Sequence, residues 1–183
     1  MITKISTYFI NQITSISNIN CDAEDIEVYI YGMECFLNTF ITIIILAIWG
    51  LLSDSLTGTF LWIAVFSSLR HNTGGYHAHT HAGCIISSVL LGISASFIPI
   101  IKYKYILLIL FCILLLFLII VSPVSSAVKP LTKEEKIKNK KYAVLKLCII
   151  FLISLLLPPQ LSIFPAYAAV CTSLLMIPAI FVQ

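Results

Sequence analysis

The residues best suited to chemistry in this chain are gathered in one short stretch. All four histidines lie within eleven positions, and a cysteine follows three residues after the last of them. The same stretch carries an arginine and a Gly-Gly pair, although 60% of the whole chain is hydrophobic. Imidazoles beside a thiol suit thiol catalysis, metal binding or pH sensing. The residues concerned are Arg70, His71, Gly74, Gly75, His77, His79, His81 and Cys84.

Thiol catalysis needs a thiolate nucleophile, a base that forms it, and donors for the oxyanion that develops on attack. Cys84 begins an apolar segment, so we expect it near a helix N-terminus, where the helix dipole and a neighbouring imidazolium favour the thiolate. His77 is the candidate base. Backbone N–H groups of Gly74 and Gly75 could approach a substrate closely, and Arg70 could supply a fixed positive charge.

The spacing of His77 and Cys84 sets a geometric condition on this mechanism. The two residues are seven positions apart, and two helical turns would separate them by about 10.5 Å. Proton transfer requires hydrogen-bonding distance, about 3 Å. Since a straight helix would keep the two side chains apart, we predict a bend at or near Gly83.

Metal binding would use the same residues differently. His77 and His81 have the i, i+4 spacing that places two imidazoles on one helix face, and Cys84 with His71 or His79 would complete a zinc-like set of ligands. Against this reading, the chain has no HExxH or CxxC motif, and no acidic residue lies close by in the sequence. The residues alone leave thiol catalysis, metal binding and a pH-sensing or merely interfacial histidine cluster open.

The elements that must position this stretch are predicted to be membrane helices. Only 10% of residues are charged and the mean hydropathy is +1.04, which leaves too little polar surface for a water-soluble globule. We predict one integral membrane domain, residues 1–183, folded as an all-α polytopic bundle. Because a full span needs about 20 residues, we expect four clear spans and two shorter or re-entrant segments. The six apolar segments are 36–52, 57–69, 84–101, 105–121, 143–157 and 161–182.

Residues 1–20 are predicted to contain an amphipathic helix. Ile2, Ile5, Phe9, Ile13 and Ile16 recur at three- and four-residue steps among polar residues. This pattern is typical of a helix that lies in the membrane interface. Packing of the same helix on the protein's own cytoplasmic face is the alternative.

The segment 122–142 is predicted to be a basic cytoplasmic loop, because it is rich in lysine and cytoplasmic loops carry an excess of positive charge. If all six segments cross, the histidine stretch and both termini are cytoplasmic as well. Thr132 and Glu135 have capping-box spacing, so we expect a short basic helix from about Lys133. Its lysines are solvated, bind anionic lipid or bind an acidic peptide. The chain has no nucleic-acid motif and no P-loop.

The combination of these residues resembles the accessory gene regulator protein B family (AgrB) of Gram-positive quorum-sensing systems. The matching residues are Arg70, Gly74-Gly75, His77-Ala78 and Cys84, followed by Ser122-Pro123-Val124 and Lys129-Pro130-Leu131. The length, the hydropathy and the basic central loop match as well.

The resemblance implies a cysteine endopeptidase of the plasma membrane, without metal or cofactor, whose active site faces the cytoplasm. It would remove the acidic C-terminal tail of an AgrD-like precursor peptide through an acyl-enzyme thioester and help cyclise the remainder to a thiolactone or lactone pheromone. By position, Cys84 would be the nucleophile and His77 the base, with Arg70, Gly74 and Gly75 positioning substrate or oxyanion. The candidate tail-binding residues are Lys133, Lys136, Lys138, Lys140 and Lys141.

Two other classes of function are kept beside this one. The first is a zinc-type metal-binding membrane protein that uses the histidine cluster without proteolysis, and the second is a non-catalytic membrane scaffold. A homodimer is also expected, because small membrane bundles often bury additional surface in this way.

Overall fold

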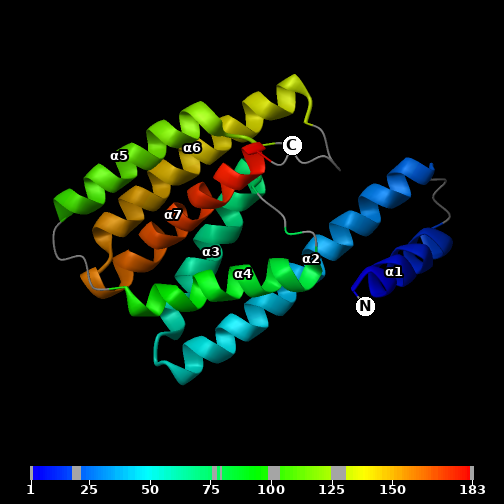
Figure 1. Ribbon diagram of the computed structural model, residues 1–183, viewed down its shortest axis with the longest axis horizontal. Helices are drawn as coiled ribbons and strands as arrows, with labels where there is room; N and C mark the ends of the chain where they lie inside the picture. The colour runs from blue at the N-terminus through cyan, green and yellow to red at the C-terminus, as the bar shows by residue number, and fades with distance from the viewer. Residues whose placement is uncertain are drawn as a thin grey trace.

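The computed structural model describes residues 2–17, 22–75, 78, 80–98, 104–124 and 131–181, and the regular elements within them are all helical (Figure 1). The predicted all-α fold class is therefore confirmed. The elements are α1 (Ile2–Ser17), α2 (Ala23–Leu52), α3 (Leu56–Thr73), α4 (His81–Ser94), a 3-10 helix η1 (Ala95–Phe97), α5 (Lys104–Val121), α6 (Lys133–Leu156) and α7 (Pro159–Phe181).

The six predicted apolar segments fall largely on the helices α2 to α7. Among the described residues, two helices are long and apolar enough to cross a membrane by themselves: α2, and α7 over Pro159–Ala179. Shorter apolar helices cover His81–Phe97 and Leu108–Val121. The structure thus supports a membrane-associated helical protein, and a topology with six segments stays a prediction.

The start of α6 agrees with the capping-box spacing. The Thr132 side chain accepts a hydrogen bond from the Glu135 N–H, and the Glu135 carboxylate accepts one from the Thr132 N–H. These two bonds satisfy donors that a helix N-terminus otherwise leaves without partners. The predicted basic helix is therefore the first part of a longer helix that continues into the fifth apolar segment.

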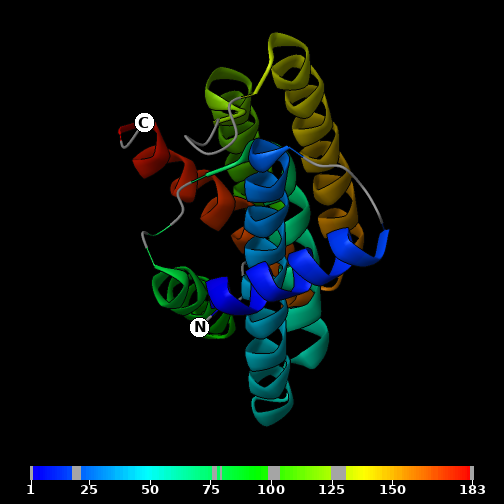
Figure 2. The same ribbon diagram turned by 90° about the vertical axis from the view of Figure 1, so that its right-hand side faces the viewer.

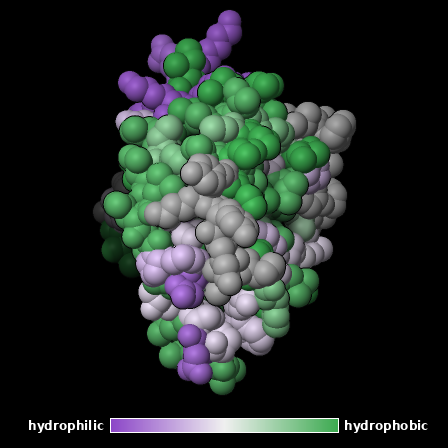
Figure 3. All heavy atoms as spheres, turned by 90° about the vertical axis from the view of Figure 1, so that its left-hand side faces the viewer, coloured by the Kyte–Doolittle hydropathy of each residue, from purple (hydrophilic) through white to green (hydrophobic). Residues whose placement is uncertain are grey.

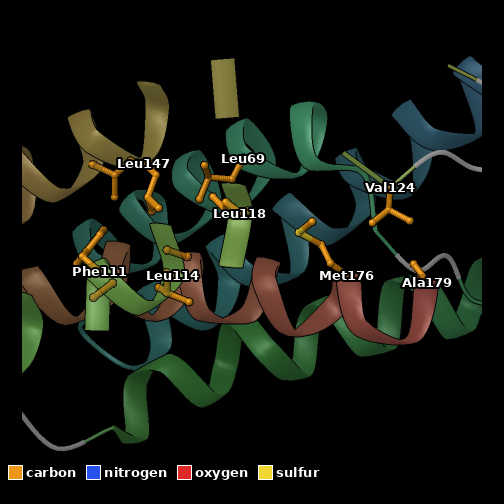
Figure 4. Packing of buried hydrophobic residues seen from close by; sticks show 11 residues of the cluster. Leu69, Phe111, Leu114, Leu118, Val124, Leu147, Met176 and Ala179 are labelled. Carbon is orange, nitrogen blue, oxygen red and sulfur yellow. The ribbon is translucent and has the colours of Figure 1, made fainter. Parts of the chain in front are cut away.

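The centre of the bundle is formed by α3 and α7, which pack against each other. One buried cluster joins them to α5 and α6 through residues such as Leu69, Leu118, Leu147 and Met176 (Figure 4). A second cluster joins them to α2 and to the region around η1. In the apolar part of α7, 61% of residues are buried, against 11% in α2. Thus α7 is a core helix, whereas α2 exposes most of its surface.

The N-terminal helix α1 crosses α2 and packs against it (Figure 2). Its buried residues are Ser6 and Ile10, whereas Phe9, Ile13 and Ile16 of the predicted apolar stripe are exposed. An amphipathic helix is therefore present, and its apolar stripe is available to a membrane interface.

Hydrophobic side chains form a broad band on one face of the molecule (Figure 3). Figure 3 shows this band across one face, with hydrophilic side chains gathered above and below it. Such a band suits a lipid environment, because exposed apolar side chains need no polar cover there.

Candidate active site

Cys84 lies in the first turn and a half of α4. Thr80 caps this helix: its side chain accepts a hydrogen bond of 3.1 Å from the Gly83 N–H. The Cys84 N–H donates to the Thr80 carbonyl at 3.1 Å, and the Cys84 side chain is half-buried. The predicted position of Cys84 near a helix N-terminus is confirmed.

The break that the His77–Cys84 pair requires lies just before α4. Thr80 has an extended backbone, with φ −125° and ψ 145°, and α4 begins at His81. Gly83 is inside the helix, so the bend expected at or near Gly83 is placed at Thr80. The helix that carries Cys84 therefore begins at His81 and does not extend back through Thr80. The His77 and His79 side chains themselves lie outside the described residues.

A cavity of about 910 Å³ opens beside Cys84. Its walls come from α2, α3, α4 and the first part of α6, and from Gly74, Gly75 and Val124 between the helices. Cys84 and Ser88 line one side, whereas Tyr31 and Cys35 line another. Its volume lies in the upper part of the range that ligand pockets occupy.

Arg70 lies in the last turn of α3 and also lines this cavity. Its guanidinium carbon is 5.7 Å from the centroid of the Phe66 ring. Negative charge on Cys84 or Cys35 would act favourably on this guanidinium. The structure thus brings Arg70 and Cys84 into one electrostatic environment.

Gly74 ends α3 and joins it to another segment. Its N–H donates to the Arg70 carbonyl at 3.0 Å. The backbone pairs in parallel with Val124, whose N–H donates to the Thr73 carbonyl at 2.9 Å. A Cβ at Gly74 would lie 2.2 Å from the Val124 carbonyl oxygen. Since the Gly74 N–H is already used within the helix, Gly75 is the better placed of the two glycines to donate to a substrate.

The basic helix contributes one lysine to the cavity. Among the described residues of α6, those that line it are Glu135, Lys138, Asn139 and Tyr142. Their spacing of three and four residues places them on one face of the helix. Of the five lysines predicted to bind a peptide tail, the structure therefore places Lys138 at the cavity and the others on the remaining faces of α6.

A comparison with known proteins identifies the family. The model of the family described as accessory gene regulator B matches residues 2–181. The chain belongs to this family. An AgrB-like protein of Clostridium perfringens (strain 13 / Type A) is 30% identical over 161 residues, which cover 83% of this chain and 74% of that protein. Protein FsrB of Enterococcus faecalis (strain ATCC 47077 / OG1RF) is 27% identical over 156 residues, which cover 81% of this chain and 63% of that protein. No solved structure was found to match the chain.

Membership in the AgrB family confirms the resemblance that the motifs indicated. Together with the apolar helices, it points to a membrane protein involved in the processing of a quorum-sensing precursor peptide. The motif segments that carry the resemblance also meet in space, because Gly74 pairs with Val124.

Sequence reasoning missed the contribution of α2 to the cavity. Tyr31, Cys35, Asn38 and Thr42 all line it, at spacings that place them on one face of a mostly apolar helix. The structure places Cys35 on the lining of the same cavity as Cys84 and Arg70. A polar stripe on an apolar helix is itself a signal of an internal surface, and this signal could have identified the site.

A polar network connects α6 to the end of α3 that carries Arg70. The Lys146 ammonium group donates to the Ser68 carbonyl at 2.9 Å and to the Asn72 side-chain oxygen. The Asn72 amide nitrogen donates to Asn139 at 3.4 Å. Asn72 is thus engaged by two side chains of α6. Lys146 therefore faces inward and links α6 to α3.

The metal alternative gains no support from the part of the chain that the structure describes. Within it, no three His, Cys, Asp or Glu side chains are grouped so that they could hold a metal ion. His81, one of the candidate ligands, has both ring nitrogens within hydrogen-bonding distance of protein groups. His77 and His79 lie outside the described residues.

Proposed function

We propose that this AgrB-family protein is a multi-pass membrane cysteine endopeptidase that removes the C-terminal tail of an AgrD-like precursor peptide. Cys84 is the nucleophile and His77 the general base. The observation that carries the proposal is the position of Cys84: it lies near the N-terminus of α4, at a cavity shared with Arg70. A helix N-terminus and a cation both favour the thiolate that such chemistry requires.

The reaction begins when His77 takes the proton of Cys84 and the thiolate attacks the carbonyl that precedes the tail. We assign stabilisation of the oxyanion of the tetrahedral intermediate to Arg70 and the Gly75 N–H, because both residues line the cavity. His77 then returns the proton to the leaving amine, so the tail departs and a thioester joins the peptide to Cys84. A Cys or Ser side chain of the peptide attacks this thioester, which closes the ring and releases the enzyme thiol.

The cavity suits this sequence of steps, because ring closure competes with hydrolysis and is favoured where water is excluded. Leu46, Trp62 and Phe66 line one part of the cavity, and Lys138 lines another. We assign the acidic tail to the Lys138 side, with Lys133, Lys136, Lys140 and Lys141 adding to the positive potential of α6. The active site is assigned to the cytoplasmic side of the membrane, and a homodimer and contacts with lipid belong to the same proposal.

The test uses the purified protein in proteoliposomes with a synthetic precursor that has a central Cys and an acidic tail. Cys84→Ser and His77→Ala are expected to abolish release of the tail. Cys112→Ser is the matched control, because Cys112 is exposed on α5. Mass spectrometry of the wild-type reaction should detect the tail-less peptide joined to Cys84. Normal tail release by Cys84→Ser would refute the proposal, and bound zinc together with an unreactive Cys84 would favour the metal-binding alternative.

A further inference from the structure

His81, the first residue of α4, is held by two other helices. Its Nδ1 is 3.1 Å from Asn38 Nδ2 on α2. Its Nε2 is 3.1 Å from Thr3 Oγ1 on α1 and 3.5 Å from Glu34 Oε1 on α2. The His81 side chain is 33% exposed and that of Glu34 is 16% exposed. One imidazole therefore ties the beginning of α4 to α1 and α2.

The tautomer of the neutral His81 ring is coupled to the orientation of the Asn38 amide. With the amide nitrogen toward the ring, Asn38 donates and His81 Nδ1 accepts. The proton of the neutral ring then lies on Nε2, where Thr3 and Glu34 can accept it. Reversal of the Asn38 amide would instead present its oxygen to a protonated Nδ1. In either orientation both ring nitrogens are engaged by protein groups, so His81 is poorly suited to accept the Cys84 proton.

The position of this ring matters because Cys84 follows one helical turn later. His81 and Cys84 are three residues apart, a spacing that places them on neighbouring parts of one helix face. On α2, Glu34 and Asn38 flank Cys35, which lies near Cys84 at the cavity. The Glu34 carboxylate also lies by the N-terminus of α4, where the helix dipole favours a negative charge. A shift of the His81 ring would therefore carry the first turns of α4, and with them Cys84, away from α2.

Helix α1 supplies the outermost contact of this cluster. It crosses α2 with its first turn beside the beginning of α4 (Figure 2). Ser6 and Ile10 bury α1 against its neighbours, and Thr3 reaches His81 from the same helix. The packing of α1 and the position of α4 are thus linked through the His81 side chain.

We propose that His81, clamped by Glu34, Asn38 and Thr3, is a positioning residue that sets the place of Cys84 relative to Arg70 and α2. This inference rests on the proposed function, in which Cys84 is the nucleophile. It separates two histidines by role: His77 moves the proton, whereas His81 holds the helix that carries the thiol.

The test compares His81→Leu with His81→Gln in proteoliposomes. His81→Leu is expected to lower kcat for tail release by between about tenfold and a hundredfold, because small displacements of reacting groups have effects of this size. KM should change by less than about threefold, because the lining of the cavity is retained. His81→Gln, whose amide can still donate to Glu34, should recover a large part of the loss.

A matched pair of variants tests the contact from α1. Thr3→Val should lower kcat, because it removes the hydroxyl that contacts His81. Thr7→Val loses a bond only to the Thr3 carbonyl within α1, so it should leave kcat unchanged.

Alkylation of Cys84 by iodoacetamide, followed by mass spectrometry, gives a readout that does not need the peptidase activity. His81→Leu should change the alkylation rate and leave the pH at which it is half-maximal unaltered, whereas His77→Ala should shift that pH. A wild-type kcat and alkylation rate in His81→Leu would overturn the positioning role while leaving the peptidase proposal intact. Complete loss of activity in both His81 variants, with a shifted alkylation profile, would assign the base to His81 instead. If wild-type protein releases no tail, the proposed function fails, and the alkylation rates still test the clamp.

Discussion

Replacement of Gly74 by alanine is expected to destabilise the junction between α3 and the segment that carries Val124. Gly74 has φ 69° and ψ −149°, a combination that residues with a Cβ avoid. Holding another residue there costs about 1–3 kcal/mol. The Gly74 N–H already donates to the Arg70 carbonyl. We therefore expect the substitution to lower the free energy of unfolding and not to remove a donor to the substrate.

A steric term adds to this conformational cost. The new Cβ would lie 2.2 Å from the Val124 carbonyl oxygen, and because this atom belongs to the backbone, the two segments must separate. Separation would weaken the 2.9 Å hydrogen bond from the Val124 N–H to the Thr73 carbonyl, worth about 0.5–1.5 kcal/mol. The sum is about 1.5–4.5 kcal/mol, a large part of a typical free energy of unfolding of about 5–15 kcal/mol.

The measurement is thermal unfolding in detergent, with Gly32→Ala as the control. A Cβ at Gly32 meets nothing within 4 Å, and alanine is favoured over glycine inside a helix by about 0.5–1 kcal/mol. We expect Gly74→Ala to unfold at a clearly lower temperature and Gly32→Ala to unfold at or above the wild-type temperature. Equal stability of the two variants would refute the close approach of Gly74 and Val124.

Two further predictions concern lysines of α6, with the exposed Lys141 as the shared control. Lys138→Gln should raise KM for an acidic-tailed precursor by up to about fivefold, since an exposed ion pair contributes about 0.2–1 kcal/mol. Lys141→Gln should raise KM by a smaller factor. Added salt should reduce the difference in KM between Lys138→Gln and the wild type. An equal rise in KM for the two glutamine substitutions would show that the lysines contribute only to the overall positive potential of α6 and that Lys138 has no specific contact with the tail. Lys146→Met should lower the free energy of unfolding by about 1–3 kcal/mol, because the Asn72 oxygen loses its donor, whereas Lys141→Met should stay within about 0.5 kcal/mol of wild type. Similar unfolding temperatures for these two methionine variants would contradict the inward position of Lys146.

Local features of the fold follow from the sequence, because they depend on neighbouring residues. The apolar segments predict the helices α2 to α7, and the spacing of Thr132 and Glu135 predicts the start of α6. The start of the apolar run likewise places Cys84 near a helix N-terminus. The sequence predicts a bend at or near Gly83 and does not by itself indicate the Thr80 cap, although a threonine before a helical run is a common start signal.

Contacts between distant segments could not be read from periodicity. The partners Thr3 and His81 are 78 positions apart, and so are Ser68 and Lys146. Helical periodicity gives the faces of each helix but not the register between helices, which depends on how whole surfaces interdigitate. For this reason the sequence did not indicate that His81 and Lys146 each form hydrogen bonds between helices.

The helix boundary at Thr80 weighs differently on the two chemical interpretations of the histidine stretch. The case for a metal pair rested on the i, i+4 spacing of His77 and His81, which places two imidazoles on one face only if both residues share a helix. Because α4 begins at His81, that spacing no longer implies a common face. The case for thiol catalysis was limited by the two helical turns expected between His77 and Cys84, and the same boundary removes that limit. The start of α4 therefore removes both the helical argument for a metal pair and the helical objection to proton transfer between His77 and Cys84.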